Sequence, residues 1–354
     1  MDAEFKARIE RQLATCREEI EATDDAEVKQ HYRQIMDALA TVTVEGPRIL
    51  VFRPISTGDL IVQSLAAELL VKKYPGCSVD FMMDSPDMPA VLASNPFIRR
   101  AFVTPHLDWG TFTSKDGRTV GEIGRNYDMR FGSYWWNPPM AKSMMEDCGL
   151  PTDYTRVKLY KNPTHEENAR KFWLGETRLR IMVQPDMLSK WHGDKSRLYE
   201  ELTKYGLVKF VSFSNSLEAN LEILRQADVF VGCHGGLEHA AAAVGCQCCS
   251  MPLVYNPEYV VVAYYQNRYR PAHLQHRVVR PVNWCGKYEC VSLLPPNPRW
   301  GPYLEQGHTF PNKFSPMQQR PCVKGFVKTC IHEIAVETVM AEFAELVRIR
   351  GGQP

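Results

Sequence analysis

The feature that most constrains the fold is an alternation of short apolar runs and helix-like segments that begins after Gly46-Pro47. Runs of this kind, rich in branched residues, are typical of strands that a parallel sheet buries on both faces. The first series predicts strands at 48–52, 79–83 and 101–103, with helices between them. Because crossovers between parallel strands are right-handed, this βαβαβ order predicts a Rossmann-like half.

The same alternation starts again in the second part of the chain. Strands are predicted at 180–183, 208–212 and 228–231, and the last one leads through a Gly-rich turn into a helix of small residues. Two such halves in series predict a cleft between them, where ligands of α/β proteins tend to bind. The expected fold class is therefore α/β, with two Rossmann-like domains facing a cleft.

Segments at both ends add helices to this core. Residues 1–46 repeat apolar side chains at spacings of three and four, which predicts a helical extension. It would form a hairpin packed on the main body or on a second subunit, and the alternative is a regulatory arm. Residues 331–354 predict a C-terminal helix, and the two domains then occupy 47–175 and 176–330.

Two further segments interrupt the alternation. Residues 161–171 are charged and contain Pro163, and residues 271–325 are rich in Pro with little periodicity. Both segments are interpreted as irregular connections.

The composition excludes some classes of protein. The 354 residues include 42 Lys and Arg against 41 Asp and Glu, so no polybasic field is available for a nucleic-acid partner. No apolar run approaches the roughly 20 residues that span a bilayer, and the charged N-terminus has no signal core. The eleven cysteines then indicate reduced thiols or metal ligands. The expected location is cytoplasmic, with peripheral contact to the inner face of the membrane and homo-oligomerisation left open.

The strongest local motif is the Gly-rich turn from Gly232 to His239, between a predicted strand and a predicted helix. Glycines allow close backbone approach, and the free N–H groups at a helix start attract phosphate. His234 and His239 flank the turn and could donate to phosphate or ribose oxygens. The alternatives are a turn whose glycines serve packing alone, or a histidine pair that binds metal, although no third ligand lies nearby in sequence.

The second motif is the loop from Arg53 to Asp59, which leaves the carboxyl end of the first strand. This edge of the sheet is where α/β domains build their sites. Asp59 falls at the start of the next helix and is a candidate catalytic base. The alternative is an N-cap or first-turn carboxylate that only stabilises the helix.

Together the two motifs resemble those of the family-nine glycosyltransferases, whose best-known members are the ADP-heptose:lipopolysaccharide heptosyltransferases. The loop 53–59 is similar to the N-terminal motif of that family, and Asn95-Pro96-Phe97-Ile98 is similar to a turn before its third strand. The segments 227–232 and 234–245 resemble its C-terminal donor motif. The resemblance covers roughly 48–105 and 178–250 of the sequence.

The resemblance implies a GT-B architecture, in which 47–175 binds the acceptor and 176–330 binds a nucleotide diphosphate-sugar. It implies an inverting transfer that needs no metal, with Asp59 as the base and Lys190 stabilising the departing phosphate. The acceptor would be a hydroxyl of a glycan, a lipid-linked molecule or a protein. The donor-binding residues expected on this basis are Arg53, Ser56, Thr57, Gly58, His234, Gly235, Gly236 and His239.

The sequence also departs from the family. Members usually carry an acidic residue and then Ser or Thr before the motif glycine, where this chain has His234 and Gly235. A missing hydroxyl removes one phosphate ligand, although the backbone N–H groups remain. The alternatives are therefore a nucleotide-sugar epimerase or hydrolase of the same fold, or a catalytically silent nucleotide- or carbohydrate-binding relative.

Four cysteines near the C-terminal end form two loose pairs, Cys285 with Cys290 and Cys322 with Cys330. Four thiolates can hold zinc or iron tetrahedrally in a structural site. Some relatives carry paired cysteines near this end. The alternative is a set of unconnected buried thiols.

Overall fold

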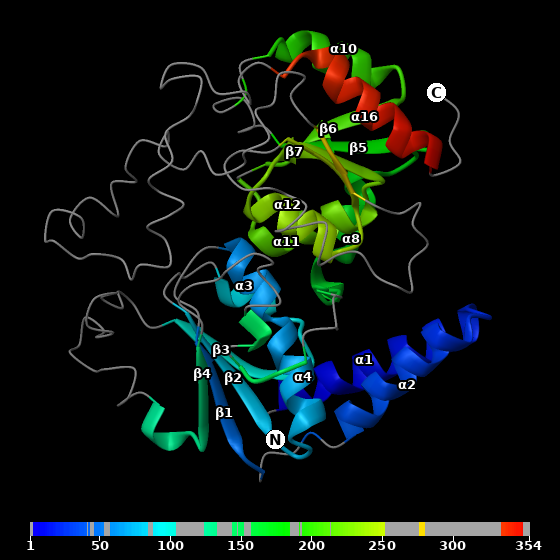
Figure 1. Ribbon diagram of the computed structural model, residues 1–354. Helices are drawn as coiled ribbons and strands as arrows, with labels where there is room; N and C mark the ends of the chain where they lie inside the picture. The colour runs from blue at the N-terminus through cyan, green and yellow to red at the C-terminus, as the bar shows by residue number, and fades with distance from the viewer. Residues whose placement is uncertain are drawn as a thin grey trace, which may run out of the picture.

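The protein is an α/β structure with two parallel sheets, shown in Figure 1. The computed structural model describes residues 3–40, 42, 46–52, 57–83, 88–103, 124–132, 144–146, 148–151, 157–184, 191, 193–212, 214–251, 276–279 and 334–349. Among the described helices, none combines the length and the apolar character needed to cross a lipid bilayer.

The first sheet has the strand order β3-β2-β1-β4. The strand β1 (Arg48–Phe52) pairs in parallel with β2 (Ser78–Met83) on one side and with β4 (Met129–Gly132) on the other, and β3 (Ile98–Val103) continues beyond β2. Three helices connect these strands: α3 (Thr57–Gln63), α4 (Leu65–Lys73) and α5 (Met88–Leu92). A short 3-10 helix, η1 (Gly124–Asn126), precedes β4.

A buried network ties this sheet together. Asp80 of β2 is fully buried, and its carboxylate accepts hydrogen bonds from Arg99 at 2.8 Å and from the hydroxyl of Tyr127 at 2.7 Å. A buried charge needs such partners, because an unpaired carboxylate inside a protein costs several kcal/mol.

The second sheet has the strand order β6-β5-β7-β8-β9, again with every described pair parallel. Its strands are β5 (Leu179–Val183), β6 (Gly206–Phe210), β7 (Val229–Cys233), β8 (Gln247–Met251) and β9 (Arg277–Val278). Its helices are α8 (Pro163–Phe172), α10 (Lys195–Thr203), α11 (Leu217–Gln226), α12 (Gly236–Ala243) and α16 (Val336–Ile349).

Helices cover both faces of the second sheet (Figure 1). Alternate residues of a strand face opposite sides, so Ile181 and Val183 pack with α10 and α16, whereas Met182 belongs to the core that contains α11 and α12. The core that contains Met182, α11 and α12 is continuous with the core of the first sheet. The two halves are therefore joined by packed apolar side chains.

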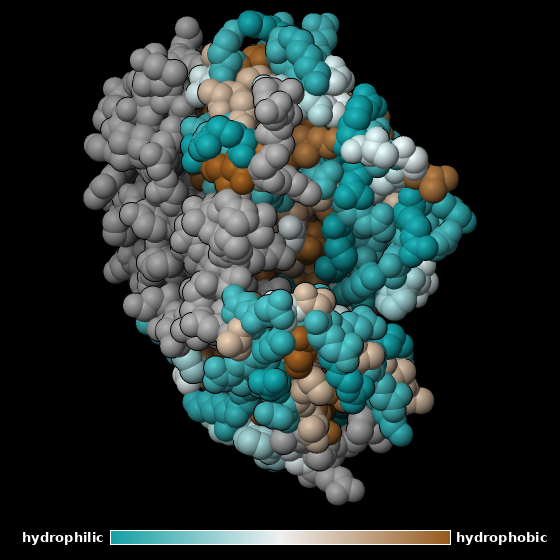
Figure 2. All heavy atoms as spheres, turned by 90° about the vertical axis from the view of Figure 1, so that its right-hand side faces the viewer, coloured by the Kyte–Doolittle hydropathy of each residue, from teal (hydrophilic) through white to brown (hydrophobic). Residues whose placement is uncertain are grey.

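Two helices precede the first sheet, α1 (Ala3–Ala22) and α2 (Ala26–Ala40). The helix α1 buries Phe5, Ile9 and Cys16, which lie on one face at helical spacing. They join the core of the first sheet. The face that carries α1 and α8 is mostly hydrophilic over the described residues (Figure 2).

The interpretation of 161–171 as an irregular connection is wrong, because α8 occupies Pro163–Phe172. The side chain of Asn162 accepts a hydrogen bond from the backbone N–H of Thr164 at 3.1 Å, and a proline follows it at the first helical position. Both are regular helix-start signals. The interpretation of 271–325 is also wrong at Arg277–Val278, which pair with β8 as a fifth strand.

Candidate functional site

The two sequence motifs follow strands at points where the strand order reverses. In the first sheet the chain goes from β1 to β2 on one side and later reaches β4 on the other. In the second sheet it goes from β5 to β6 and then returns to β7 on the opposite side. Ligands of open parallel sheets bind outside the carboxyl ends of strands at such switch points. The helices α3 and α12 begin at these ends, after β1 and β7.

The two motifs meet in direct contact. A Cβ atom built on Gly58 would lie 2.6 Å from Cδ2 of the His239 ring, and one on Gly236 would lie 3.1 Å from Cβ of Thr57. The start of α3 is therefore pressed against the start of α12 at two glycines, and larger side chains at either position would force the helices apart. Segments far apart in the sequence form one surface at this point.

The start of α12 has open space beside it. Gly235 precedes the helix in an extended conformation, and a Cβ atom built there would meet no heavy atom within 4 Å. The first N–H groups of a helix have no partner within the helix, and the helix dipole adds positive potential. This end of α12 is therefore suited to bind an anion such as phosphate.

A carboxylate that the sequence reasoning missed lies under the Gly-rich turn. Glu238 is fully buried, and its Oε2 lies 2.7 Å from Nδ1 of His234. Burial raises the pKa of Glu238, but the charge of His234 and hydrogen bonds from His234 and Ser250 outweigh it, so that the pKa lies below its ordinary value. Because an ionised carboxylate has no proton to give, Nδ1 of His234 is the donor in this hydrogen bond.

The signal for this pair was present in the sequence. His234 and Glu238 are four residues apart across the first turn of a helix, a spacing at which side chains meet. The family pattern has an acidic residue where this chain has His234. In this chain a buried carboxylate, Glu238, lies one turn further along α12 and contacts that histidine.

His239 lies beside this pair and is 3% exposed. Its ring centroid is 5.4 Å from that of His234 in an edge-to-face arrangement. Burial, together with the charge of His234, lowers the pKa of His239 to about 3, and Glu238 opposes this only in part. His239 is therefore neutral at neutral pH.

The lowered pKa of His239 predicts a loss of stability in mild acid. The unfolded chain takes up a proton at this histidine near pH 6.5 and the folded chain does not, so falling pH favours unfolding. We expect this residue to remove about 1 kcal/mol per pH unit between pH 6 and pH 5. Urea unfolding at pH 7, 6 and 5 measures it, and the variant His239→Gln should show a shallower decline. Equal declines in both proteins would contradict the prediction.

Asp59 lies in the first turn of α3 and is partly exposed, next to the contact between Gly58 and His239. Since α3 begins at Thr57, Asp59 is not the N-cap residue, although its charge still suits the first turn. The structure thus brings Thr57, Gly58 and Asp59 together with the Gly-rich turn.

The remaining predicted site residues lie outside the described part of the chain: Arg53, Ser56, Lys190, Cys285, Cys290, Cys322 and Cys330. Among the residues that the structure does describe, no group of three or more His, Cys, Asp or Glu side chains is placed to hold a metal ion.

No protein-family model matches the sequence, and no curated protein matches it. Solved structures do match the fold. E. coli ADP-heptose lipopolysaccharide heptosyltransferase II is 14% identical over 86% of this chain and 99% of its own, with a TM-score of 0.54. A family 9 glycosyl transferase from Veillonella parvula is 13% identical over 85% and 97%, with a TM-score of 0.55.

A third match is TibC, an iron-containing dodecameric glycosyltransferase from enterotoxigenic E. coli, 15% identical over 87% of this chain and 78% of its own, with a TM-score of 0.50. These similarities confirm the α/β fold class and its resemblance: the chain has a fold like that of the family-nine glycosyltransferases.

Proposed function

We propose that this protein is a glycosyltransferase that moves a sugar from a nucleotide diphosphate-sugar to an acceptor hydroxyl, with inversion and without a catalytic metal. One observation carries the proposal. The first turn of α3, which carries Asp59, and the helix start at Gly236 form a single surface through the contacts of Gly58 and Thr57. A carboxylate therefore lies beside an anion-binding helix end, the combination that such a transfer needs.

In the proposed reaction the donor diphosphate binds at the start of α12, where the backbone N–H groups donate to its oxygens, as does Nε2 of His234 when that ring carries both protons. Asp59 removes the proton from the acceptor hydroxyl as this oxygen attacks the anomeric carbon. The bond from that carbon to the phosphate oxygen breaks, and the charge that develops on the diphosphate is stabilised by the helix end, Lys190 and Arg53. Attack from the face opposite the nucleotide inverts the configuration.

Glu238 acts on this reaction through His234. A carboxylate that accepts from Nδ1 fixes the orientation of the ring against the start of α12, where the donor is proposed to bind. Glu238 is therefore a positioning residue in this scheme and does not touch the substrate.

The variant Glu238→Gln tests that role. We expect the KM for the donor sugar nucleotide to rise about tenfold, because the charged hydrogen bond that orients His234 is lost. Steady-state kinetics would measure KM and kcat, and a thermal melt would report stability. A lower melting temperature with an unchanged KM would mean that Glu238 only stabilises the fold.

Calorimetric titration with ADP, GDP, UDP and CDP, without added metal, tests the proposed function. We expect one nucleotide to bind, and we expect the variant Gly236→Leu to lose that binding because its side chain would meet Thr57. The nucleobase of the nucleotide that binds then determines which sugar nucleotides are tried as donors in a transfer assay. Absence of binding by all four nucleotides would contradict the proposed donor site.

The main alternative is a catalytically silent nucleotide-binding relative, and His234 and Gly235 at the acidic and hydroxyl positions of the family motif favour it. Binding of a nucleotide without turnover of any matching donor sugar would support this alternative. Turnover of donor in the absence of acceptor would instead indicate an epimerase or a hydrolase.

We further propose that Cys285, Cys290, Cys322 and Cys330 bind one structural zinc or iron ion. Four thiolates are suitable ligands for either metal, and the structurally similar TibC is iron-containing. Elemental analysis of the purified protein should find about one metal ion per chain. The variant Cys285→Ser should lose most of it, and Cys77→Ala should retain it, since Cys77 is buried in the first half of the protein. Full metal content in both variants would exclude these ligands.

A further inference from the structure

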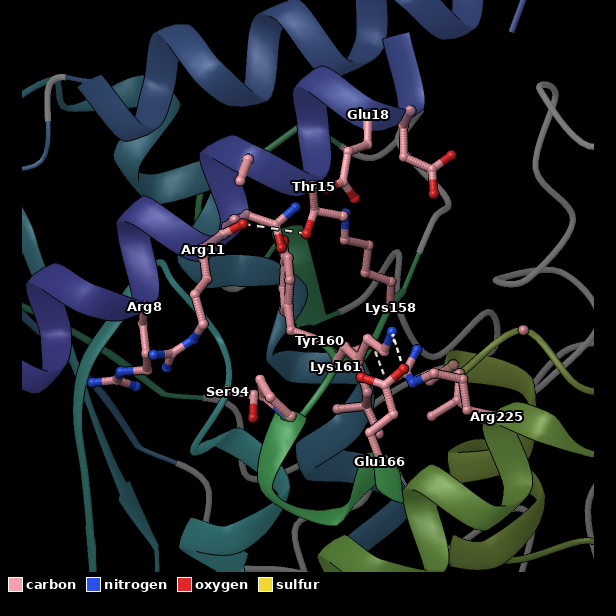
Figure 3. Close-up of a pocket in the computed structure, with 18 of the residues that line it drawn as sticks. Arg8, Arg11, Thr15, Glu18, Ser94, Lys158, Tyr160, Lys161, Glu166 and Arg225 are labelled. Atoms are coloured by element: carbon pink, nitrogen blue, oxygen red, sulfur yellow. Dashed lines mark hydrogen bonds and ion pairs between the residues drawn. The ribbon is translucent and has the colours of Figure 1, made fainter. Parts of the chain in front are cut away.

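A pocket lies at the end of α12 opposite to Gly236, where Ala242 and Ala243 line it. Figure 3 shows residues of its lining. Its volume is about 650 Å³, within the range of small-molecule sites. The walls come from α1, from the segment 157–161, from the start of α8 and from the last turn of α12. Since α12 has 8 residues, the pocket is separated from the candidate donor site by about 12 Å of helix.

The pocket carries more basic than acidic side chains. The basic residues are Arg8, Arg11, Lys158, Lys161 and Arg225, and the acidic residues are Glu18, Glu19 and Glu166. Two of the basic groups are already neutralised, because Lys161 lies 2.8 Å from Glu166 and Arg225 lies 3.1 Å from the buried Glu222. The other lining groups are Arg8, Arg11 and Lys158 against Glu18 and Glu19, so one positive charge is in excess, and two of these three basic groups are arginines of α1.

These two arginines are one turn apart on α1, and both line the pocket, as Figure 3 shows. Arg8 is held in place by hydrogen bonds to the carbonyl oxygens of Ala93 and Arg99, both at 2.9 Å. Within the described residues, the guanidinium of Arg11 has no hydrogen bond or ion pair. Like charges at this spacing repel, and an oxyanion between them would remove the repulsion and gain charged hydrogen bonds.

Aromatic side chains line the pocket beside this charged end. The ammonium group of Lys158 lies 4.6 Å from the ring centroid of Tyr160 and 5.7 Å from that of Tyr32. Figure 3 shows Lys158 extending along Tyr160 toward α1, near Thr15. The rings and the stem of the lysine offer an apolar wall to the body of a ligand, and a sugar ring packs well on such a surface.

We propose that this pocket binds a sugar phosphate, with the phosphate held between Arg8 and Arg11 and the sugar against Tyr160. The site is distinct from the candidate donor site, and the proposal does not depend on the glycosyltransferase assignment. Because α1 and α12 both contribute to its walls, the ligand contacts the N-terminal helix and the second half of the protein at once.

Calorimetric titration of the full chain with glucose 1-phosphate tests this proposal. We expect binding by the wild type and a loss of at least tenfold in affinity in the variant Arg11→Ala, because a charged hydrogen bond is removed from an exposed side chain without disturbing the core. The matched control is Arg17→Ala, since Arg17 is an exposed arginine of the same helix that does not line the pocket.

Two further measurements separate this site from others. An excess of ADP, GDP, UDP and CDP together should leave the affinity for glucose 1-phosphate unchanged, whereas competition with any of them would assign the ligand to the donor site and overturn the proposal. Inorganic phosphate should bind at least tenfold more weakly than glucose 1-phosphate, because it lacks a body to pack on Tyr160. Equal affinities, absence of binding by the wild type, or normal binding by Arg11→Ala would each overturn it.

Discussion

Replacing Asp59 with asparagine is expected to reduce the rate of sugar transfer at least about 100-fold, the usual contribution of a positioned general base. Asparagine has nearly the same shape and still suits a helix start, so α3 should form normally. Nucleotide affinity should stay within about twofold, because the proposed phosphate contacts come from α12 and not from this carboxylate. A transfer assay at saturating donor, together with calorimetry, measures both quantities.

The transfer rate and the nucleotide affinity of Asp59→Asn together decide what this residue does. A normal rate in Asp59→Asn would remove this residue from the mechanism and leave the donor site intact. A lost nucleotide affinity with an unchanged melting temperature would mean that the carboxylate belongs to the binding surface. A reduced rate with normal affinity is the only result that supports its role as the base.

Replacing Gly58 with valine is expected to weaken nucleotide binding at least tenfold. The new Cβ atom would lie 2.6 Å from Cδ2 of His239, a contact that real side chains do not make. His239 is buried and has no room to move away, so the start of α3 must separate from the start of α12. Overpacking of this kind also lowers the free energy of unfolding by about 1–3 kcal/mol.

The matched control for this variant is Gly175→Val. Gly175 has a φ of +77°, and a Cβ atom built there would meet no heavy atom within 4 Å. This replacement should cost about 1 kcal/mol in stability because of the backbone conformation, and nucleotide affinity should not change. Equal loss of affinity in both variants would mean that the contact between α3 and α12 has no special role in binding.

Sequence reasoning predicted most of the strands and several of the helices of this fold because their signals are local. The apolar run at β1 and the small residues of α12 each indicate their structure within a few positions. The helix α8 was missed because its charged surface resembles a connection, although Asn162-Pro163 marked its start. The strand β9 has two residues, and only its distant partner β8 identifies it.

The candidate site was predicted in part for the same reason. Each motif could be assigned to the carboxyl end of the strands of its own sheet, because the order of strands and helices along the chain determines the topology of a βαβ unit. The contact of Gly58 with His239 depends on how α3 packs against α12, and no local pattern encodes it. The buried Glu238 was overlooked because burial is a property of the whole fold, and only burial turns this first-turn acid into the partner of His234.

The contact between α3 and α12 also has a consequence for how the protein matures. One wall of the candidate site comes from each half, and the halves leave the ribosome one after the other. Neither half contains the site before the two have docked, however well its own sheet has folded. In a refolding experiment, recovery of nucleotide binding should therefore lag behind recovery of helical circular dichroism, and the lag would time the docking step.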